Sequence, residues 1–341
     1  MPLQPWSAAA FGARRLGLPG RAWRAEAAPP TPPPSPPSSP RPRPLRVGVL
    51  AGGDGFWEPA RACVRAVTEA AEALAAGGHD VQRWDPTAAG ADTRRAAVLY
   101  YALLGADGGL SGFKAGLEGE ALHEMYSLLN VLASLPWLLR APLSAVLRAL
   151  GQERAAELLA TARGRSARDY WALVAERDAF KTAFFDAWRM AGFDVLLCPA
   201  MGVPAFLHGQ SRDLTPACSA TFLWNLLDAP SGVLPVTRVR ADECTYEAPP
   251  AQRDAFAAAA GRAMAGAEGL PVGVQVVGLP FRDEECLEAM EELERLLAAA
   301  PDARGEAWRA GGGVPADALN KTLARLGAGR ALSYLAGEAS F

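Results

Sequence analysis

The chain has 341 residues, of which 50% are hydrophobic and 21% charged, and its formal net charge is −3. This composition is typical of a globular protein with enough apolar material for one large domain or two. The near-neutral charge excludes the strongly basic surface of most nucleic-acid-binding proteins, so no nucleic-acid partner is expected. The five cysteines are scattered and form no C-x-x-C pair, which favours a reducing compartment and indicates no metal site and no cofactor.

Residues 1–43 differ in composition from the rest of the chain. Residues 29–42 are proline and serine apart from Thr31 and Arg41, and such a run cannot bury enough apolar surface to offset its ordering entropy. Four arginines precede the first acidic residue, Glu26. Two interpretations stay open for this segment: an organelle targeting peptide, and an unstructured leader or misassigned start. We predict a disordered leader.

The next segment predicts a strand–helix–strand unit. Residues 45–50 form a short apolar run typical of a buried strand, helical spacing follows, and residues 81–84 predict a second strand. The glycines after the first strand are Gly52, Gly53 and Gly55, but they form neither a G-x-G-x-x-G nor a G-K-[ST] motif. A tight turn is therefore favoured over a nucleotide-binding loop.

Residues 125–150 are rich in leucine and include Trp137 beside Leu138. A transmembrane helix needs about 20 consecutive apolar residues, whereas Pro136 divides this stretch and Arg140 ends the run. Two interpretations remain. The leucines are ordinary core of a helical pair, or they form a helical hairpin that lies in a membrane interface, with tryptophan and arginine at its rim.

Further along, the periodicity predicts helices and buried strands in alternation. Residues 167–191 predict a long amphipathic helix with an aromatic stripe that is typical of core, and residues 193–200 predict a buried strand. Residues 233–239 and 271–279 predict two more core strands, and residues 283–296 a final helix. Together these elements indicate an α/β fold.

Two C-terminal stretches carry the most specific pattern in the chain. Residues 225–236 contain Asn-x-x-Asp-x-Pro-x-Gly-x-x-Pro, and residues 270–280 contain Leu-Pro-Val-Gly-Val-Gln ahead of a helical segment. Together they resemble the C-terminal end of the amidase-signature family, and within it the fatty-acid amide hydrolase branch. Asn225 and Asp228 could suggest acid–base chemistry, but a turn capped by these side chains explains them, and we interpret them as structural.

The resemblance covers residues 44–299 and implies a partial amidase-signature fold, a mixed β-sheet flanked by helices with a helical-hairpin membrane cap at about 125–150. Residues 300–341 match no known pattern and are left as an unassigned tail. The implied location is intracellular, as a peripheral monotopic protein of an endoplasmic-reticulum-type endomembrane. The implied partners are a lipid amide substrate and a membrane surface, and a homodimer is left open.

The resemblance also implies roles for individual residues. Eight positions correspond to the wall of an acyl channel: Thr215, Cys218, Phe222, Phe256, Leu128, Val131, Leu158 and Ala162. Six positions correspond to the membrane cap: Leu132, Leu135, Trp137, Leu138, Leu139 and Arg140. An apolar channel suits a lipid tail, because each buried methylene contributes about 0.8 kcal/mol. Plain core packing is the alternative at each channel position.

Members of this family hydrolyse amides with a serine nucleophile, a second serine and a lysine base. The corresponding Gly- and Ser-rich loop does not occur in the sequence, and its nearest imitation, residues 108–112 beside Lys114, aligns downstream of the catalytic half. There is no G-x-S-x-G motif, and His79, His123 and His208 lie in unrelated contexts. We therefore expect no catalytic residue in this chain and no activity of the chain alone.

Three hypotheses follow from these patterns. The chain is part of a membrane-associated serine hydrolase that cleaves long-chain fatty-acid amides to a fatty acid and an amine; or it is another amidase-signature member; or it is a non-catalytic lipid-binding remnant. The leucine-rich stretch argues against the second hypothesis, because an amidase acting on polar substrates has no need of an apolar cap.

Overall fold

The computed structural model describes residues 43–299 apart from 89, 109, 118, 124, 125, 127–129, 133, 134, 162 and 208, and it leaves out the side chain of Trp137. The chain divides into two compact units, Met1–Arg43 and Pro44–Phe341. All elements named below belong to the second unit. The predicted leader, up to residue 42, and the predicted tail, residues 300–341, lie outside the described residues.

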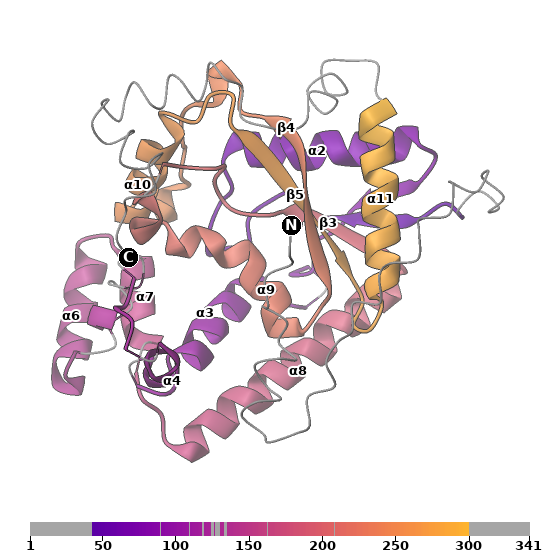
Figure 1. Ribbon diagram of the computed structural model, residues 1–341. Coiled ribbons are helices and arrows are strands. Elements are labelled where there is room, and N and C mark those ends of the chain that lie inside the picture. Colours follow the sequence, from indigo (N-terminus) through magenta and orange to yellow (C-terminus); the bar gives the residue numbers. More distant parts are fainter. Residues whose placement is uncertain are drawn as a thin grey trace. The chain divides into compact units, whose positions relative to one another are not determined.

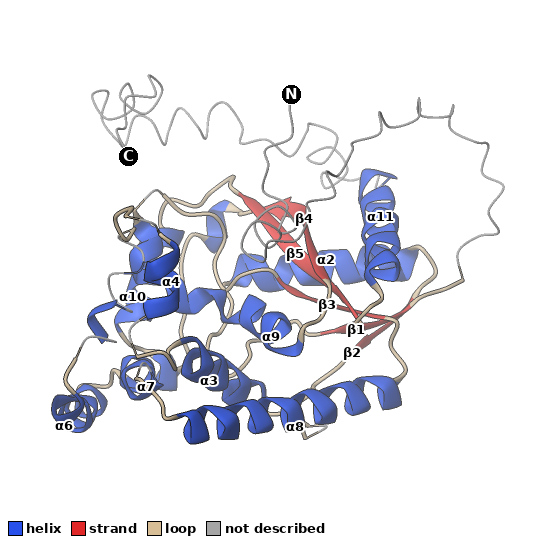
Figure 2. Ribbon diagram, turned by 60° about the horizontal axis from the view of Figure 1, so that its bottom comes forward, coloured by secondary structure: helices blue, strands red, loops and turns tan. Residues whose placement is uncertain are grey.

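A five-stranded mixed sheet lies at the centre of this unit (Figure 2). Its strands are β1 (Arg46–Val49), β2 (Asp80–Arg83), β3 (Val195–Pro199), β4 (Ser231–Arg238) and β5 (Pro271–Gly278). The strand order is β2-β1-β3-β5-β4, with β1 parallel to β2 and β3, and β5 antiparallel to β3 and β4. The mixed sheet predicted from the sequence is confirmed, and β4 forms one of its edges.

Helices flank the sheet on both sides (Figure 1). They are α2 (Arg61–Ala76), α3 (Thr93–Leu104), α4 (Ser111–Gly116), α6 (Trp137–Ala149), α7 (Glu153–Thr161), α8 (Ala167–Ala191), α9 (Ser219–Leu227), α10 (Ala255–Met264) and α11 (Asp283–Ala299). The predicted bounds of α8 are confirmed. The Ser166 hydroxyl accepts a hydrogen bond from the Asp169 N–H at its start, and Gly192, with φ 72°, ends it.

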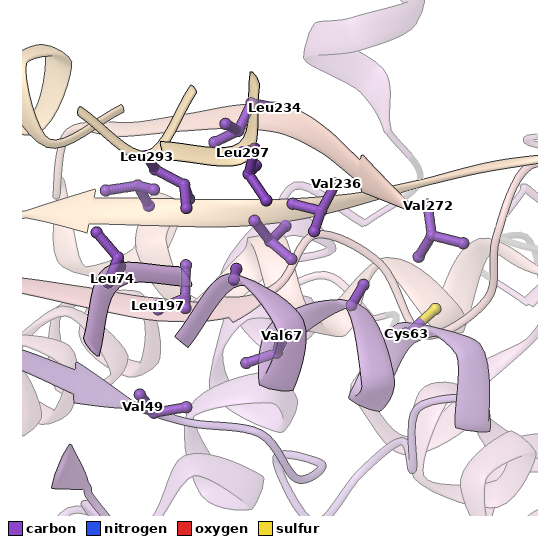
Figure 3. Packing of buried hydrophobic residues seen from close by; sticks show 14 of the residues in the cluster. Val49, Cys63, Val67, Leu74, Leu197, Leu234, Val236, Val272, Leu293 and Leu297 are labelled. Atoms are coloured by element: carbon purple, nitrogen blue, oxygen red, sulfur yellow. The ribbon is translucent and has the colours of Figure 1, made fainter. Parts of the chain in front are cut away.

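One face of the sheet packs against α2 and α11, as Figure 3 shows. Val67 and Leu74, seven residues apart on α2, and Leu293 and Leu297, four apart on α11, belong to the same buried cluster as Leu197 of β3. These spacings place each pair on one side of its helix, which is the pattern of an amphipathic helix on a sheet. The sequence periodicity therefore predicts the two helices and their apolar sides.

The opposite face packs against α8 and α9. Phe184 and Trp188 of α8 and Trp224 of α9 are buried against Leu196 and Cys198, the alternate residues of β3. Because neighbouring strand residues point to opposite faces, β3 contributes to both layers, and this explains its uninterrupted apolar sequence. The fully buried residues of α8, Phe184, Phe185 and Trp188, lie in its C-terminal half, while Leu173 of its N-terminal half packs at the border of the same cluster. The N-terminal half extends past the sheet (Figures 1 and 2).

A helical hairpin lies away from the sheet, formed by α6 and α7 (Figure 2). Pro136 directly precedes α6, as its helix-breaking geometry predicts, and Pro142 lies within the first turns of that helix. The partner arm is α7, which begins at Glu153, so the hairpin extends beyond the predicted limit of residue 150. No helix among the described residues is both long and apolar enough to cross a bilayer.

Candidate functional site

A single apolar cluster lies between α3, α7, α9 and α10, and we call it the α7–α10 cluster. Its buried members include Tyr101 of α3, Leu158 and Leu159 of α7, and Phe256 and Ala260 of α10. The helices that contribute these side chains are separated by up to about 150 residues of sequence. The cluster is therefore a product of the tertiary fold rather than of one local segment.

The predicted channel residues converge on this cluster. Leu158 and Phe256 are buried within it, and Phe222 of α9 is half-buried and packs against it. Thr215 and Cys218 are half-buried at the two ends of a short 3-10 helix, Thr215–Cys218, whose Ala217 belongs to the cluster. Five of the eight predicted positions thus gather at one place.

The other three predicted channel positions are not placed there. Val131 is 58% exposed, so its side chain does not share the buried surface of the cluster. Leu128 and Ala162 lie outside the described residues. For all eight positions the role of channel wall stays a prediction.

Two tyrosines of α3 complete the aromatic part of the cluster, and sequence reasoning missed both. The ring of Phe222 stacks on Tyr100 with centroids 4.3 Å apart and meets Tyr101 edge-on at 5.3 Å. Tyr101 is buried and its hydroxyl has no hydrogen-bond partner among the described residues, and burial raises its pKa well above the ordinary value. The apolar spacing around the Tyr-Tyr pair predicts a helix with a buried side, and this pattern could have identified the two tyrosines as candidates.

A buried ion pair fixes the base of the cluster. Arg154 of α7 is 1% exposed and donates from Nε to Asp254 Oδ2 at 2.7 Å. Its guanidinium lies 4.6 Å from the ring centroid of Trp57 and also donates to the carbonyl oxygen of Phe56. The same Asp254 carboxylate accepts from the backbone N–H of Phe256, so it both pairs with Arg154 and begins α10. This contact positions a predicted channel residue.

Five of the six predicted cap residues divide into two groups, and the side chain of the sixth, Trp137, lies outside the described part of the structure. Leu132 is buried in the α7–α10 cluster and Leu135 packs against it, while Arg140 donates from Nε to the carbonyl oxygen of Leu135 and from Nη1 to that of Leu159. These three residues contact the body of the protein.

Leu138 and Leu139 lie on the outside instead, 65% and 52% exposed. Val146 and Leu150, which sequence reasoning did not assign, extend the same helix with exposures of 52% and 67%. We call these four residues the α6 surface. Each of the four side chains exposes more than half of its surface.

The mixed sheet, the flanking helices and the apolar cluster define an α/β protein. The amidase family profile matches residues 21–287, and the chain belongs to this family. The chain is 36% identical over 262 residues to "Fatty-acid amide hydrolase 1" of Sus scrofa, covering 75% of this chain and 43% of that protein. It is 31% identical over 256 residues to "Fatty acid amide hydrolase 1" of Caenorhabditis elegans, covering 73% and 42%.

The fold agrees with this sequence relationship. A solved structure of "Fatty acid amide hydrolase" superposes with a TM-score of 0.54 at 19% identity, covering 74% of this chain and 39% of that one. At this identity the likeness concerns the fold alone. The chain spans less than half the length of each of these relatives.

Proposed function

We propose that this chain forms the substrate-binding side of a fatty-acid amide hydrolase, which cleaves long-chain fatty-acid amides to a fatty acid and an amine. The serine–serine–lysine set that performs hydrolysis in the family would then come from sequence outside these 341 residues, because no matching Gly- and Ser-rich loop occurs in them. The role of the described residues is to bind and orient the acyl chain. The chain alone would bind lipid amides without hydrolysing them.

The observation that carries this proposal is the convergence of Leu158, Phe222 and Phe256 on one apolar cluster from three different helices. A lipid tail gains free energy from each methylene it buries, so a continuous apolar surface is the chemical requirement for acyl binding. Half-buried Thr215 and Cys218 border this surface. Side-chain rearrangement of the stacked Tyr100 and Phe222 rings would open space for the tail along α9.

The first test measures binding of saturated primary amides with 6 to 18 carbons to the purified chain. We expect affinity to rise about fourfold for each added methylene, which corresponds to about 0.8 kcal/mol. Phe222→Asp should reduce binding of the longest amide at least tenfold, because it places a charge in the cluster. Met190→Asp is the control, since that side chain on α8 is 88% exposed. Equal affinity for short and long amides would contradict the proposal.

Labelling with a fluorophosphonate then separates binding from catalysis. An activated serine reacts with this probe, so the chain alone should stay unlabelled. A labelled serine would show that the nucleophile lies within these residues. Binding of lipid amides without labelling is expected both for part of a hydrolase and for a non-catalytic lipid-binding remnant. A further experiment separates the two: if hydrolysis is recovered when the catalytic sequence is added, the chain is part of a hydrolase.

We further propose that the α6 surface contacts a membrane, and that the protein is a peripheral component of an intracellular endomembrane of the endoplasmic-reticulum type. Four exposed apolar side chains on one helix, with Arg148 in its last turn, suit shallow insertion between lipid headgroups. The hairpin adjoins the α7–α10 cluster through Leu158 and Leu159 of α7 and through Leu143 and Leu147 of α6, so a lipid entering from the membrane would have a short path to it. This arrangement favours a lipid substrate over the polar substrates of other family members.

Vesicle co-sedimentation tests the membrane contact. Leu138→Asp combined with Leu139→Asp should reduce binding to phosphatidylcholine–phosphatidylserine vesicles at least tenfold, because each leucine loses about 1.5–3 kcal/mol of apolar burial. The matched control is Phe281→Asp combined with Leu287→Asp, two residues that are 97% and 58% exposed near α11. If both double variants bind as the wild type does, the α6 surface is not a membrane contact.

A further inference from the structure

A separate cavity of about 450 Å³ opens at the carboxyl ends of β1 and β3. Ser219, Leu223 and Trp224 of α9 line it, together with Trp84 after β2. Its volume lies within the range of small-molecule sites, which are about 300–1,000 Å³. The predicted channel residues Phe222 and Phe256 are not among the residues that line it, although Trp57 of the α7–α10 cluster forms part of its wall. The cavity therefore adjoins the cluster but opens elsewhere.

The walls of this cavity carry more negative than positive charge. Asp54, Asp85 and Asp92 contribute three carboxylates. Among the described residues that line the cavity, Arg94 supplies the only positive charge. Its guanidinium is already engaged, since it donates to the carbonyl oxygen of Gly55 at 2.7 Å and to Glu157 at 2.7 Å. The three carboxylates therefore lack a free cationic partner within the cavity lining.

Asp54 is the deepest of these acids. Its Oδ1 accepts hydrogen bonds from the backbone N–H groups of Phe56 at 2.9 Å and Trp57 at 2.8 Å. Its Oδ2 is buried, and the Ser219 side chain, which also lines the cavity, is the nearby side-chain donor that favours the charged carboxylate. Burial raises the pKa of this carboxyl, which reflects the cost of holding its charge there, and the Trp57 N–H is the largest opposing contribution. A donor brought by a ligand would remove part of that cost.

Aromatic surface accompanies the carboxylates. Trp84 is half-buried and Trp224 is 2% exposed, and both line the cavity beside the apolar Leu223. Indole rings attract cations electrostatically through their faces, and acidic groups beside aromatic rings are the usual surroundings of a bound organic ammonium ion. A simple metal ion would make no favourable contact with the apolar side chains of this lining, whereas an organic cation would.

We propose that this cavity binds a small organic ammonium ion, with its charged group at Asp54 and its organic part against Trp84, Leu223 and Trp224. The proposal does not depend on the lipid-amide function, because it concerns different side chains and a different ligand class. Failure of either proposal leaves the other standing.

Three probes of matched size and different charge test it: 3-phenylpropylammonium, 3-phenylpropan-1-ol and 3-phenylpropanoate. Binding to the full chain is measured by titration calorimetry and by saturation-transfer NMR at neutral pH. We expect the cation to bind at least tenfold more tightly than the alcohol or the anion. A cation that binds no better than the alcohol, or no binding of any of the three probes, overturns the proposal.

Two variants locate the site. Asp54→Asn keeps an oxygen for the N–H groups of Phe56 and Trp57 but removes the charge, and it should weaken cation binding at least tenfold. Ala220→Met leaves the charges unchanged and fills the cavity from α9, and it should weaken all binding there. Asp178→Asn, on the exposed part of α8, should have no effect. Unchanged binding in a folded Asp54→Asn or Ala220→Met protein, checked by urea unfolding, overturns the assignment.

Discussion

Replacing Arg154 by alanine is expected to lower the free energy of unfolding by about 3–5 kcal/mol, the usual cost of removing one partner from a buried ion pair. The side chains of Arg154 and Asp254 are 1% and 3% exposed, so the carboxylate left behind would have little access to water. The variant would also lose the guanidinium beside the Trp57 ring. Urea unfolding followed by tryptophan fluorescence measures the effect.

Two further variants make this expectation specific. Asp254→Asn retains an oxygen that can cap α10 and should therefore cost less than Asp254→Ala, which loses both the charge and the cap. Arg148→Ala breaks an ion pair with Glu153 whose side chains are 48% and 45% exposed, and such pairs contribute about 0–1 kcal/mol. If Arg148→Ala and Arg154→Ala lower the free energy of unfolding by similar amounts, the buried ion pair stabilises the protein no more than the exposed one does.

Trp188→Ala should destabilise the protein by about 3–5 kcal/mol, because a large buried ring is removed and a cavity remains. Trp188 is 0% exposed, and its indole Nε1 donates to the carbonyl oxygen of Phe193 at 2.9 Å. Trp188→Phe also loses the hydrogen bond to the Phe193 carbonyl, but it keeps most of the buried ring. It should therefore lower the free energy of unfolding less than Trp188→Ala does. Thermal and urea unfolding of the two variants measure the difference.

The matched control lies on the same helix. Trp171 is 67% exposed on α8, and Trp171→Ala should change the free energy of unfolding by no more than about 0.5 kcal/mol. The comparison asks whether burial, rather than residue type, decides the cost. Equal losses at Trp171 and Trp188 would contradict the packing of α8 against the sheet.

The elements with a strong apolar period could be predicted from the sequence alone. The bounds of α8 follow from its helical spacing. Strands β3 and β5 follow from their mostly apolar sequences. Phe222 and Phe256 could be named as predicted channel residues only through family resemblance, because their periodicity is that of ordinary core. Their convergence depends on tertiary contacts that no local pattern contains.

Other features were beyond a local reading of the sequence. Arg154 and Asp254 are 100 residues apart, and each is unremarkable within its own segment. In the hairpin, periodicity indicates one apolar side but does not say what covers it. Leu132 consequently lies inside the protein while Leu138, six residues later, is exposed. The second arm was missed because α7 is only nine residues long and lies outside the leucine-rich stretch.

The position of β4 at the border of the sheet has a consequence for how this polypeptide behaves in solution. Toward its C-terminal end, Pro235 lacks a backbone N–H and an irregularity in register follows it, so further pairing is blocked there. Before Pro235 no such obstacle is present, and Val233 is 53% exposed. Of the two halves of β4, the first is therefore the one whose main chain an edge-on strand could pair with. Self-association of the isolated chain would then be controlled by this short stretch of main chain rather than by its overall charge.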